Sequence, residues 1–187
     1  MRGKLIIIVA PSGTGKSTLI KRLLGDFPML KWSVSYTTRP RRVGEIHGKD
    51  YFFTDKESFE KEIAQDAFVE WANVHGNYYG TSRRFVSDGL ERGDFLLFDV
   101  DVQGADRLLK DFKNDATAIF ITPPSIEDLS ERLKKRGTDS QEVIERRLKN
   151  AREELKRKND YDKLVVNEKV DQAYEELKII FKDIINP

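Results

Sequence analysis

The chain has 187 residues, with 33 lysines and arginines against 32 aspartates and glutamates, so its formal net charge at pH 7 is +1. This balance excludes the strongly basic surface that coats nucleic acid, and we expect no nucleic-acid partner. The sequence has no cysteine, which excludes disulfides, thiolate catalysis and cysteine zinc sites, and which suits a reducing compartment.

The N-terminal apolar run is too short for a secretory signal or a membrane span. It covers residues 5–10 and ends at Pro11. A signal core has about 7–15 apolar residues, and a membrane helix needs about 18. We therefore expect a soluble, cytoplasmic protein with no membrane partner.

Apolar runs along the chain predict buried strands that alternate with helices. The runs share β-branched and aromatic residues without polar alternation, which is typical of parallel strands covered on both faces. They cover residues 5–9, 95–100, 117–122 and 163–167. Helices are predicted after the first run as far as Gly25, over 104–112 and over 170–185. This order predicts an α/β fold, a three-layer core with a parallel sheet and right-handed crossovers.

Two segments interrupt this alternation, and we interpret both as inserts in one domain of residues 1–187. Residues 34–84 contain short aromatic strands around one helix, which a capping box over 54–57 is expected to open. Residues 125–158 are basic and helical, with Ser125 opening one helix and Thr138 a second. The remaining core then consists of residues 1–33, 85–124 and 159–187.

The stretch after the first strand has the spacing of a phosphate-binding loop. Gly13 and Gly15 can take positive φ, which lets backbone N–H groups turn toward one point. Lys16 is expected to reach the β- and γ-phosphates and Ser17 to hold Mg²⁺, at the positive end of the following helix. The loop comprises Ala10, Pro11, Ser12, Gly13, Thr14, Gly15, Lys16, Ser17 and Thr18. The usual pattern begins with glycine, and alanine at position 10 fits only if its φ stays negative.

A second group of polar residues follows in the first insert. Arg39 and Arg42 lie on a short connection, and arginine forks match phosphate oxygens. Tyr51 has a hydroxyl that can join the same anion. The carboxylate of Glu70 fits the two adjacent donors of a guanine edge, whereas adenine presents an acceptor there. As a single residue, Glu70 also fits the outward position of an alternating surface strand.

These stretches together resemble the guanylate kinase family over almost the whole chain. The matching pieces, in the same order and spacing, are "APSGTGKST", "SVSYTTRPRRVGE", "GKDYFF", "FVEWANVHGNYYGT", "LLFDVDVQGA", "IFITPPSIEDLSERLKKRGTDS" and "RL…A..E", the last over residues 147–154. The resemblance implies a P-loop NTPase-type core with a mixed α+β GMP-binding insert and a helical lid. It implies Mg²⁺-dependent transfer of the γ-phosphoryl group of ATP to GMP and dGMP, in purine nucleotide metabolism.

The resemblance also implies individual roles for residues of the first insert. Positions that match the guanine-reading residues of the family are Ser35, Glu70 and Thr81. Positions that match the residues holding the GMP phosphate are Arg39, Arg42, Tyr51 and Tyr79. The match leaves open whether the protein is a monomer or a homo-oligomer.

Phosphoryl transfer consists mainly of positioning and charge neutralisation. Asp99 and Asp101 lie at the C-terminal end of the second core strand, at the edge where open α/β sheets bind ligands. One of them is expected to bind magnesium indirectly or to orient GMP, and the sequence leaves their separate roles open. The resemblance implies that Asn167, after the last strand, touches the adenine of ATP. It also selects the last three members, from the lid, of the set expected to act on the transferring phosphoryl group, which is Lys16, Arg39, Asp99, Arg132, Arg136 and Arg147.

Two other functions compete with this interpretation. A kinase of another nucleotide or of a sugar phosphate would keep the loop, but Ser35, Glu70 and Thr81 favour guanine. A peptide-binding, guanylate-kinase-like scaffold domain would keep the fold, but such domains tend to lack an intact phosphate loop. Gly13 and Lys16 are present here, which favours an enzyme.

Overall fold

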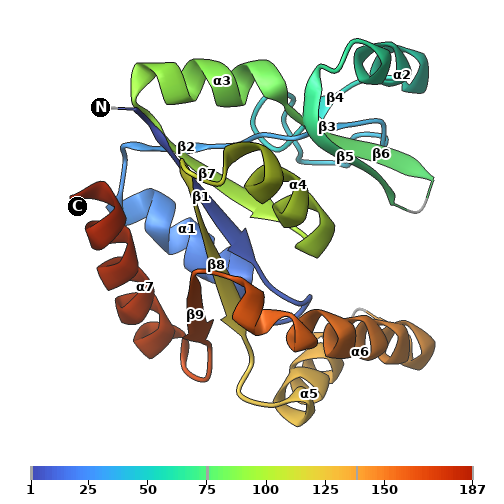
Figure 1. Cartoon of the computed structure of the whole chain (residues 1–187). Coiled ribbons are helices and arrows are strands. Elements are labelled where there is room, and N and C mark those ends of the chain that lie inside the picture. The colour runs from blue at the N-terminus through green and yellow to red at the C-terminus, as the bar shows by residue number, and fades with distance from the viewer. Residues whose placement is uncertain (1, 75, 138, 187) are drawn as a thin grey trace. The chain divides into compact units, whose positions relative to one another are not determined.

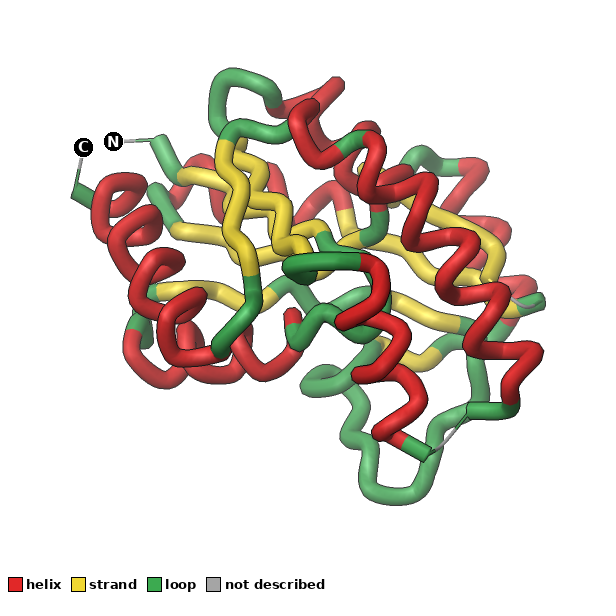
Figure 2. The backbone as a smooth tube through the Cα atoms, turned by 90° about the horizontal axis from the view of Figure 1, so that it is seen from below, coloured by secondary structure: helices red, strands yellow, loops and turns green. Residues whose placement is uncertain are grey.

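The computed structural model describes residues 2–74, 76–137 and 139–186. The chain divides into two compact units. The first unit comprises Met1–Leu5, Met29–Phe98 and Gln103–Ala116, and the second comprises Ile6–Pro28, Asp99–Val102 and Thr117–Pro187. Figure 2 shows the helices in red and the strands in yellow along the backbone.

A five-stranded sheet has the strand order β2-β7-β1-β8-β9. Its strands are β1 (Lys4–Val9), β2 (Leu30–Trp32), β7 (Phe95–Val100), β8 (Ala116–Thr122) and β9 (Lys163–Val166). β2 pairs with β7, and β8 with β9, in parallel. The predicted α/β class with a parallel sheet is confirmed. β2 was not predicted, because three residues are too few to show a periodicity.

The core of the second unit forms around β1 and the helices α1 (Lys16–Asp26) and α7 (Val170–Ile185). Ile6, Ile7 and Ile8 are fully buried, as expected for a strand that is apolar at every position. α1 and α7 contact each other, and α7 lies beside β9 (Figure 1). α1 continues through Gly25 and ends at Asp26, so the predicted stop at Gly25 was one residue early.

The first unit contains a four-stranded sheet with the order β4-β3-β6-β5. Its strands are β3 (Tyr36–Thr37), β4 (Phe52–Phe53), β5 (Phe68–Val74) and β6 (Asn77–Ser82). Phe59 of α2 (Lys56–Ala64) is fully buried, and its ring stacks on those of Phe68 and Tyr78. Gly80 leaves room for this stack, since a Cβ there would lie 2.9 Å from the Phe59 ring. The unit also contains α3 (Arg83–Arg92) and most of α4 (Val102–Phe112).

Side-chain caps fix where the helices begin. Asp55 caps α2 by accepting a 2.8 Å hydrogen bond from the Ser58 N–H, so the predicted capping box over 54–57 was wrong by one residue. Ser125 caps α5 (Ile126–Arg136) as predicted. Ser140 caps α6 (Gln141–Lys156), whereas Thr138, the predicted first residue, lies outside the described residues. The two helices pack through Leu129, Leu133, Ile144 and Ala151.

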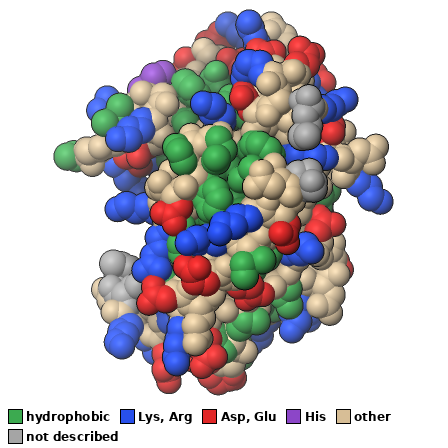
Figure 3. All heavy atoms as spheres, turned by 90° about the vertical axis from the view of Figure 1, so that its left-hand side faces the viewer, with side chains coloured by type: hydrophobic (Ala, Val, Ile, Leu, Met, Phe, Trp, Pro, Cys, Tyr) green, Lys and Arg blue, Asp and Glu red, His purple; other side chains and the backbone are tan. Residues whose placement is uncertain are grey.

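The surface mixes both signs of charge. Lysine and arginine side chains lie among aspartate and glutamate side chains on the face shown in Figure 3, as the near-equal numbers require. Among the described residues, no helix is both long and apolar enough to cross a membrane.

Candidate nucleotide sites

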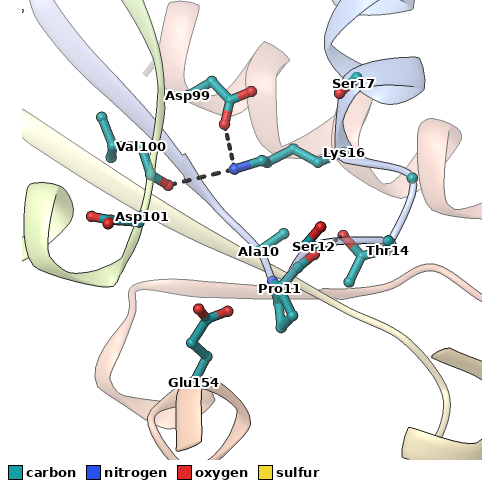
Figure 4. A pocket seen from close by; sticks show the side chains of 12 residues that line it. Ala10, Pro11, Ser12, Thr14, Lys16, Ser17, Asp99, Val100, Asp101 and Glu154 are labelled. Atoms are coloured by element: carbon teal, nitrogen blue, oxygen red, sulfur yellow. Dashed lines mark hydrogen bonds and ion pairs between the residues drawn. The ribbon is translucent and has the colours of Figure 1, made fainter. Parts of the chain in front are cut away.

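The loop between β1 and α1 forms one wall of a cavity of about 360 Å³ in the second unit (Figure 4). All but one of the nine predicted loop residues line it, from Ala10 to Ser17. Gly13 and Gly15 have φ angles of 97° and 89°, as the predicted cradle requires. Asp66 is the one non-glycine residue with positive φ among the described residues. The backbone at Ala10 therefore meets the condition under which alanine replaces the usual glycine.

Lys16 crosses the cavity from the first turn of α1. Its ammonium group forms an ion pair with Asp99 and donates a 3.5 Å hydrogen bond to the Val100 carbonyl oxygen (Figure 4). Both partners lie at the end of β7, where the sequence predicted a functional carboxylate. Asp99 thus neutralises the charge of Lys16.

The carboxylates of Asp101 and Glu154 line the same cavity as Asp99 and Ser17. In Figure 4, Glu154 points from α6 toward the loop. These four side chains present hard oxygen ligands, which suit Mg²⁺. Among the described residues, however, no group of three acidic or histidine side chains is placed to hold a metal ion alone.

Glu154 ends one of the stretches that resemble the family, but no role was predicted for it. It lies seven residues after Arg147 and therefore on the same face of α6. Burial raises the pKa of the Glu154 carboxyl, while nearby Lys16 lowers this pKa and Asp101 raises it. The raised pKa shows that burial outweighs the attraction of Lys16.

Replacing Glu154 by glutamine is expected to flatten the pH dependence of stability. A carboxyl whose pKa is higher in the folded chain holds its proton more tightly there. Its stabilising effect is complete below the usual pKa of 4.5 and is lost as the pH rises through the folded-state pKa. Urea unfolding of the ligand-free protein from about pH 4 to pH 8 measures this. The free energy of unfolding of the wild type, minus that of E154Q, should fall as the pH rises.

Glu153→Gln is the matched control, because Glu153 is exposed on the same helix and pairs with Lys156. The free energy of unfolding of the wild type minus that of E154Q should change with pH, and the corresponding value for E153Q should not follow it. If the E154Q value stays constant with pH, or changes in the same way as the E153Q value, the buried environment assigned to Glu154 is contradicted.

Two of the arginines predicted to act from a lid, Arg132 and Arg147, lie within hydrogen-bond distance of the predicted phosphate loop, at Thr14 and Ser12. Arg132 of α5 donates hydrogen bonds to the carbonyl oxygens of Asn167 at 2.8 Å and Glu168 at 3.0 Å. Arg147 of α6 donates a 3.2 Å hydrogen bond to the Ser12 hydroxyl and pairs with Asp139. The side chain of Arg136 lies outside the described residues.

In the first unit, Glu70 and Thr81 face each other across β5 and β6. The Thr81 hydroxyl donates a 2.6 Å hydrogen bond to a Glu70 carboxylate oxygen. The pairing shifts register between Phe68 and Glu70, and both Phe68 and Val69 are buried. This irregularity breaks the alternation, so Glu70 is half-buried against Thr81 instead of fully exposed.

The predicted phosphate-holding residues also gather in the first unit. The Arg39 guanidinium lies 5.4 Å from the centre of the Tyr51 ring, and the Tyr51 and Tyr79 rings meet edge to face. Glu45, which the sequence analysis did not select, accepts a 2.6 Å hydrogen bond from Arg39 and a 2.8 Å bond from the Arg42 N–H. The hydrogen bond from Arg39 holds the pKa of the Glu45 carboxyl below its usual value.

Ser35, the remaining predicted guanine contact, is half-buried beside this group. Its carbonyl oxygen accepts a 2.9 Å hydrogen bond from Phe52 N–H. The first unit therefore brings all the predicted GMP residues together on one small sheet and its connections, apart from the aspartates at the end of β7.

Comparison with known proteins identifies the family. The guanylate kinase family model matches residues 2–184. The guanylate kinase of Geobacter sulfurreducens is 48% identical over 178 residues, covering 95% of this chain and 87% of that protein. The guanylate kinase of Caulobacter vibrioides is 43% identical over 180 residues, covering 96% and 84%. The crystal structure of guanylate kinase from Anaplasma phagocytophilum superposes with a TM-score of 0.75 at 31% identity, covering 97% of this chain and 86% of that one. The chain belongs to the guanylate kinase family.

Proposed function

We propose that the chain is a guanylate kinase that transfers the γ-phosphoryl group of ATP to GMP and dGMP, giving ADP and GDP or dGDP. The observation that carries this function is the Glu70–Thr81 pair. A half-buried carboxylate oriented by a hydroxyl offers acceptors to the N1–H and 2-amino donors of guanine. The same chain carries an intact phosphate loop, so it has both a donor site and a guanine-selective acceptor site.

On the donor side, backbone N–H groups of the loop bind the ATP phosphates, and Lys16 moves from Asp99 to the phosphoryl group that is transferred. Ser17 would hold Mg²⁺, and one of the two aspartates that line the same cavity, Asp99 or Asp101, would bind Mg²⁺ indirectly or orient GMP. When bound, Mg²⁺ neutralises charge on the β- and γ-phosphate oxygens. A base is unnecessary, because an oxygen of the GMP phosphate is already an anionic nucleophile.

On the acceptor side, Arg39, Arg42, Tyr51 and Tyr79 hold the GMP phosphate. Glu45 keeps Arg39 and the backbone of Arg42 in place before GMP arrives. Residues 34–84 are the GMP-binding insert in this proposal, and residues 125–158 are a lid whose arginines exclude water from the transferring group. We place the reaction in the cytoplasm, because a cysteine-free chain suits a reducing compartment.

A panel of acceptors tests the proposal. ADP formation is measured with ATP and Mg²⁺ while GMP, dGMP, AMP, UMP and CMP are supplied separately. We expect turnover with GMP and dGMP alone. Equal turnover with AMP would show that Glu70 does not select guanine. No turnover with any acceptor, in a chain that still binds ATP, would favour a peptide-binding scaffold domain and would refute the enzyme.

A further inference from the structure

Asn167 is wholly buried in the second unit, directly after β9. Its backbone N–H donates a 2.8 Å hydrogen bond to the Thr122 carbonyl oxygen, which fixes its main chain to the end of β8. Its side-chain amide donates a 2.6 Å hydrogen bond to the carbonyl oxygen of Thr14. A carbonyl oxygen can only accept, so the side-chain nitrogen, and not the oxygen, must face it. Asn167 thus contacts the middle of the phosphate loop through the Thr14 carbonyl oxygen.

The Thr14 carbonyl also receives a cationic donor. The Arg132 guanidinium lies 3.5 Å from it and at the same time binds the carbonyl oxygens of Asn167 and Glu168. Arg132 therefore ties the residue after β9 and the phosphate loop into one network. Thr14 is held on its other side as well, because its N–H and hydroxyl both donate to the Pro11 carbonyl oxygen.

Holding the Thr14 carbonyl determines the direction of the next N–H. A trans peptide unit is planar, so the Thr14 C=O and the Gly15 N–H point in opposite directions. Because the carbonyl points to Asn167 and Arg132, the Gly15 N–H points away from them. Gly15 lines the cavity where the phosphates are expected. Two donors on the carbonyl also polarise the peptide, which makes its N–H a stronger donor.

These hydrogen bonds matter at Gly15 because a glycine has no side chain to restrict rotation about its backbone bonds. A rotated Thr14–Gly15 peptide would present a carbonyl oxygen to the phosphates and repel them. The close approach of Asn167 in turn requires glycine, since a Cβ at position 15 would lie 2.6 Å from the Asn167 amide nitrogen. The second glycine of the loop is therefore needed for this contact as well as for its positive φ.

We propose that Asn167 is a positioning residue, which acts with Arg132 to fix the Thr14–Gly15 peptide and so directs the Gly15 N–H at the nucleotide phosphates. This role rests on the proposed function only in assigning the cavity to phosphates. It differs from the adenine contact expected from the family resemblance. The Asn167 side-chain oxygen has no hydrogen-bond partner among the described residues. A contact between that oxygen and adenine is therefore the alternative role, which the experiment must distinguish from positioning.

Binding measurements without turnover separate the two roles. Asn167→Asp keeps the shape, removes the N–H donor and adds a negative charge. Asn167→Ala removes the whole group and adds no charge, so a loss shared by both variants is not charge repulsion alone. Dissociation constants are measured by calorimetry for inorganic tripolyphosphate, ADP and adenosine. Loss of the positioning hydrogen bond should raise the dissociation constants of tripolyphosphate and ADP by the same factor, about 5–20-fold, and leave that of adenosine unchanged. Weaker ADP and adenosine binding with unchanged tripolyphosphate binding would assign Asn167 to adenine and overturn the proposal.

Two further variants keep the test independent of folding defects. Arg132→Lys retains the charge but cannot reach the same carbonyl oxygens. It should also weaken the binding of tripolyphosphate, by a smaller factor. Tyr174→Phe removes a 2.8 Å hydrogen bond to Asp26, near the far end of α1 from the loop. This control should lower the melting temperature and leave all three dissociation constants unchanged. If Y174F weakens tripolyphosphate binding as much as N167D does, the loss of binding in N167D comes from general instability of the fold and the proposal fails.

Kinetics give a second readout if GMP is turned over. The N167D variant should raise KM for ATP and for ITP by the same factor and leave KM for GMP unchanged, because the Gly15 N–H that Asn167 positions faces phosphate in both donors. A change in the ATP-to-ITP ratio of kcat/KM would instead assign Asn167 to the base and overturn the positioning role. Absence of GMP turnover would refute the proposed function alone, since the calorimetric result stands without it.

Discussion

Replacing Lys16 by methionine is expected to lower kcat for GMP phosphorylation by about 10²–10³-fold, the usual effect of removing one preorganised donor from a transition state. Methionine has about the length of lysine and no charge, so the loop keeps its packing. Lys16 is the one lysine that lines the cavity among the described residues, and its ion pair with Asp99 shows that its ammonium group spans the cavity to β7. Steady-state ADP formation with saturating ATP and GMP measures the loss.

Lys21→Met is the matched control, because Lys21 is exposed on the same helix. It should retain wild-type kcat. Melting temperatures of both variants show whether the broken ion pair with Asp99 unfolds the chain. A folded K16M protein that retains more than a tenth of wild-type kcat would contradict the role given to Lys16.

Replacing Glu70 by glutamine is expected to lower kcat/KM for GMP by about 10²–10⁴-fold. A hydrogen bond to a charged group contributes about 1.5–3 kcal/mol, and Glu70 is assigned two of them to guanine. Glutamine also presents an N–H group where guanine presents donors, so one contact becomes repulsive. Steady-state kinetics with varied GMP measure the loss, and KM for ATP should stay unchanged.

Thr81→Val tests how Glu70 is oriented. It removes the hydroxyl that donates to Glu70 at 2.6 Å, and it should give a smaller loss in kcat/KM for GMP than E70Q. Thr81→Ser keeps the hydroxyl and should restore most of the activity. Glu91→Gln, on the exposed side of α3, is the control for loss of a negative charge. If E70Q lowers kcat/KM for GMP no more than E91Q does, Glu70 does not read guanine.

The sequence predicted most accurately those features that depend on neighbouring residues. The phosphate loop could be located because an all-apolar strand, two glycines and an amphipathic helix follow one another directly. The bounds of α7 were also predicted correctly, since Val170 to Ile185 shows a long helical period. In contrast, α3 was missed, because Val86 and Leu90 are its only buried large side chains. Such a short apolar face is hard to distinguish from a polar loop.

Features that depend on distant parts of the chain were hidden in the sequence. The irregular pairing after Phe68 turns Glu70 toward Thr81, and an alternating pattern cannot show it. Glu45 and Glu154 are single acidic residues in a chain of which 35% is charged, so only their contacts distinguish them. Asn167 lies 153 residues from Thr14 along the chain, and no local sequence pattern indicates that the two residues are in contact.

A single-turnover reaction tests whether this chain moves a phosphoryl group from ATP to GMP. The reaction contains γ-labelled ATP, Mg²⁺, excess GMP and enzyme above the ATP concentration. Products are separated by chromatography and the label is counted in GDP and in inorganic phosphate. We expect nearly all of the transferred label in GDP. Label in inorganic phosphate alone, or ATP that binds and stays intact, would contradict it.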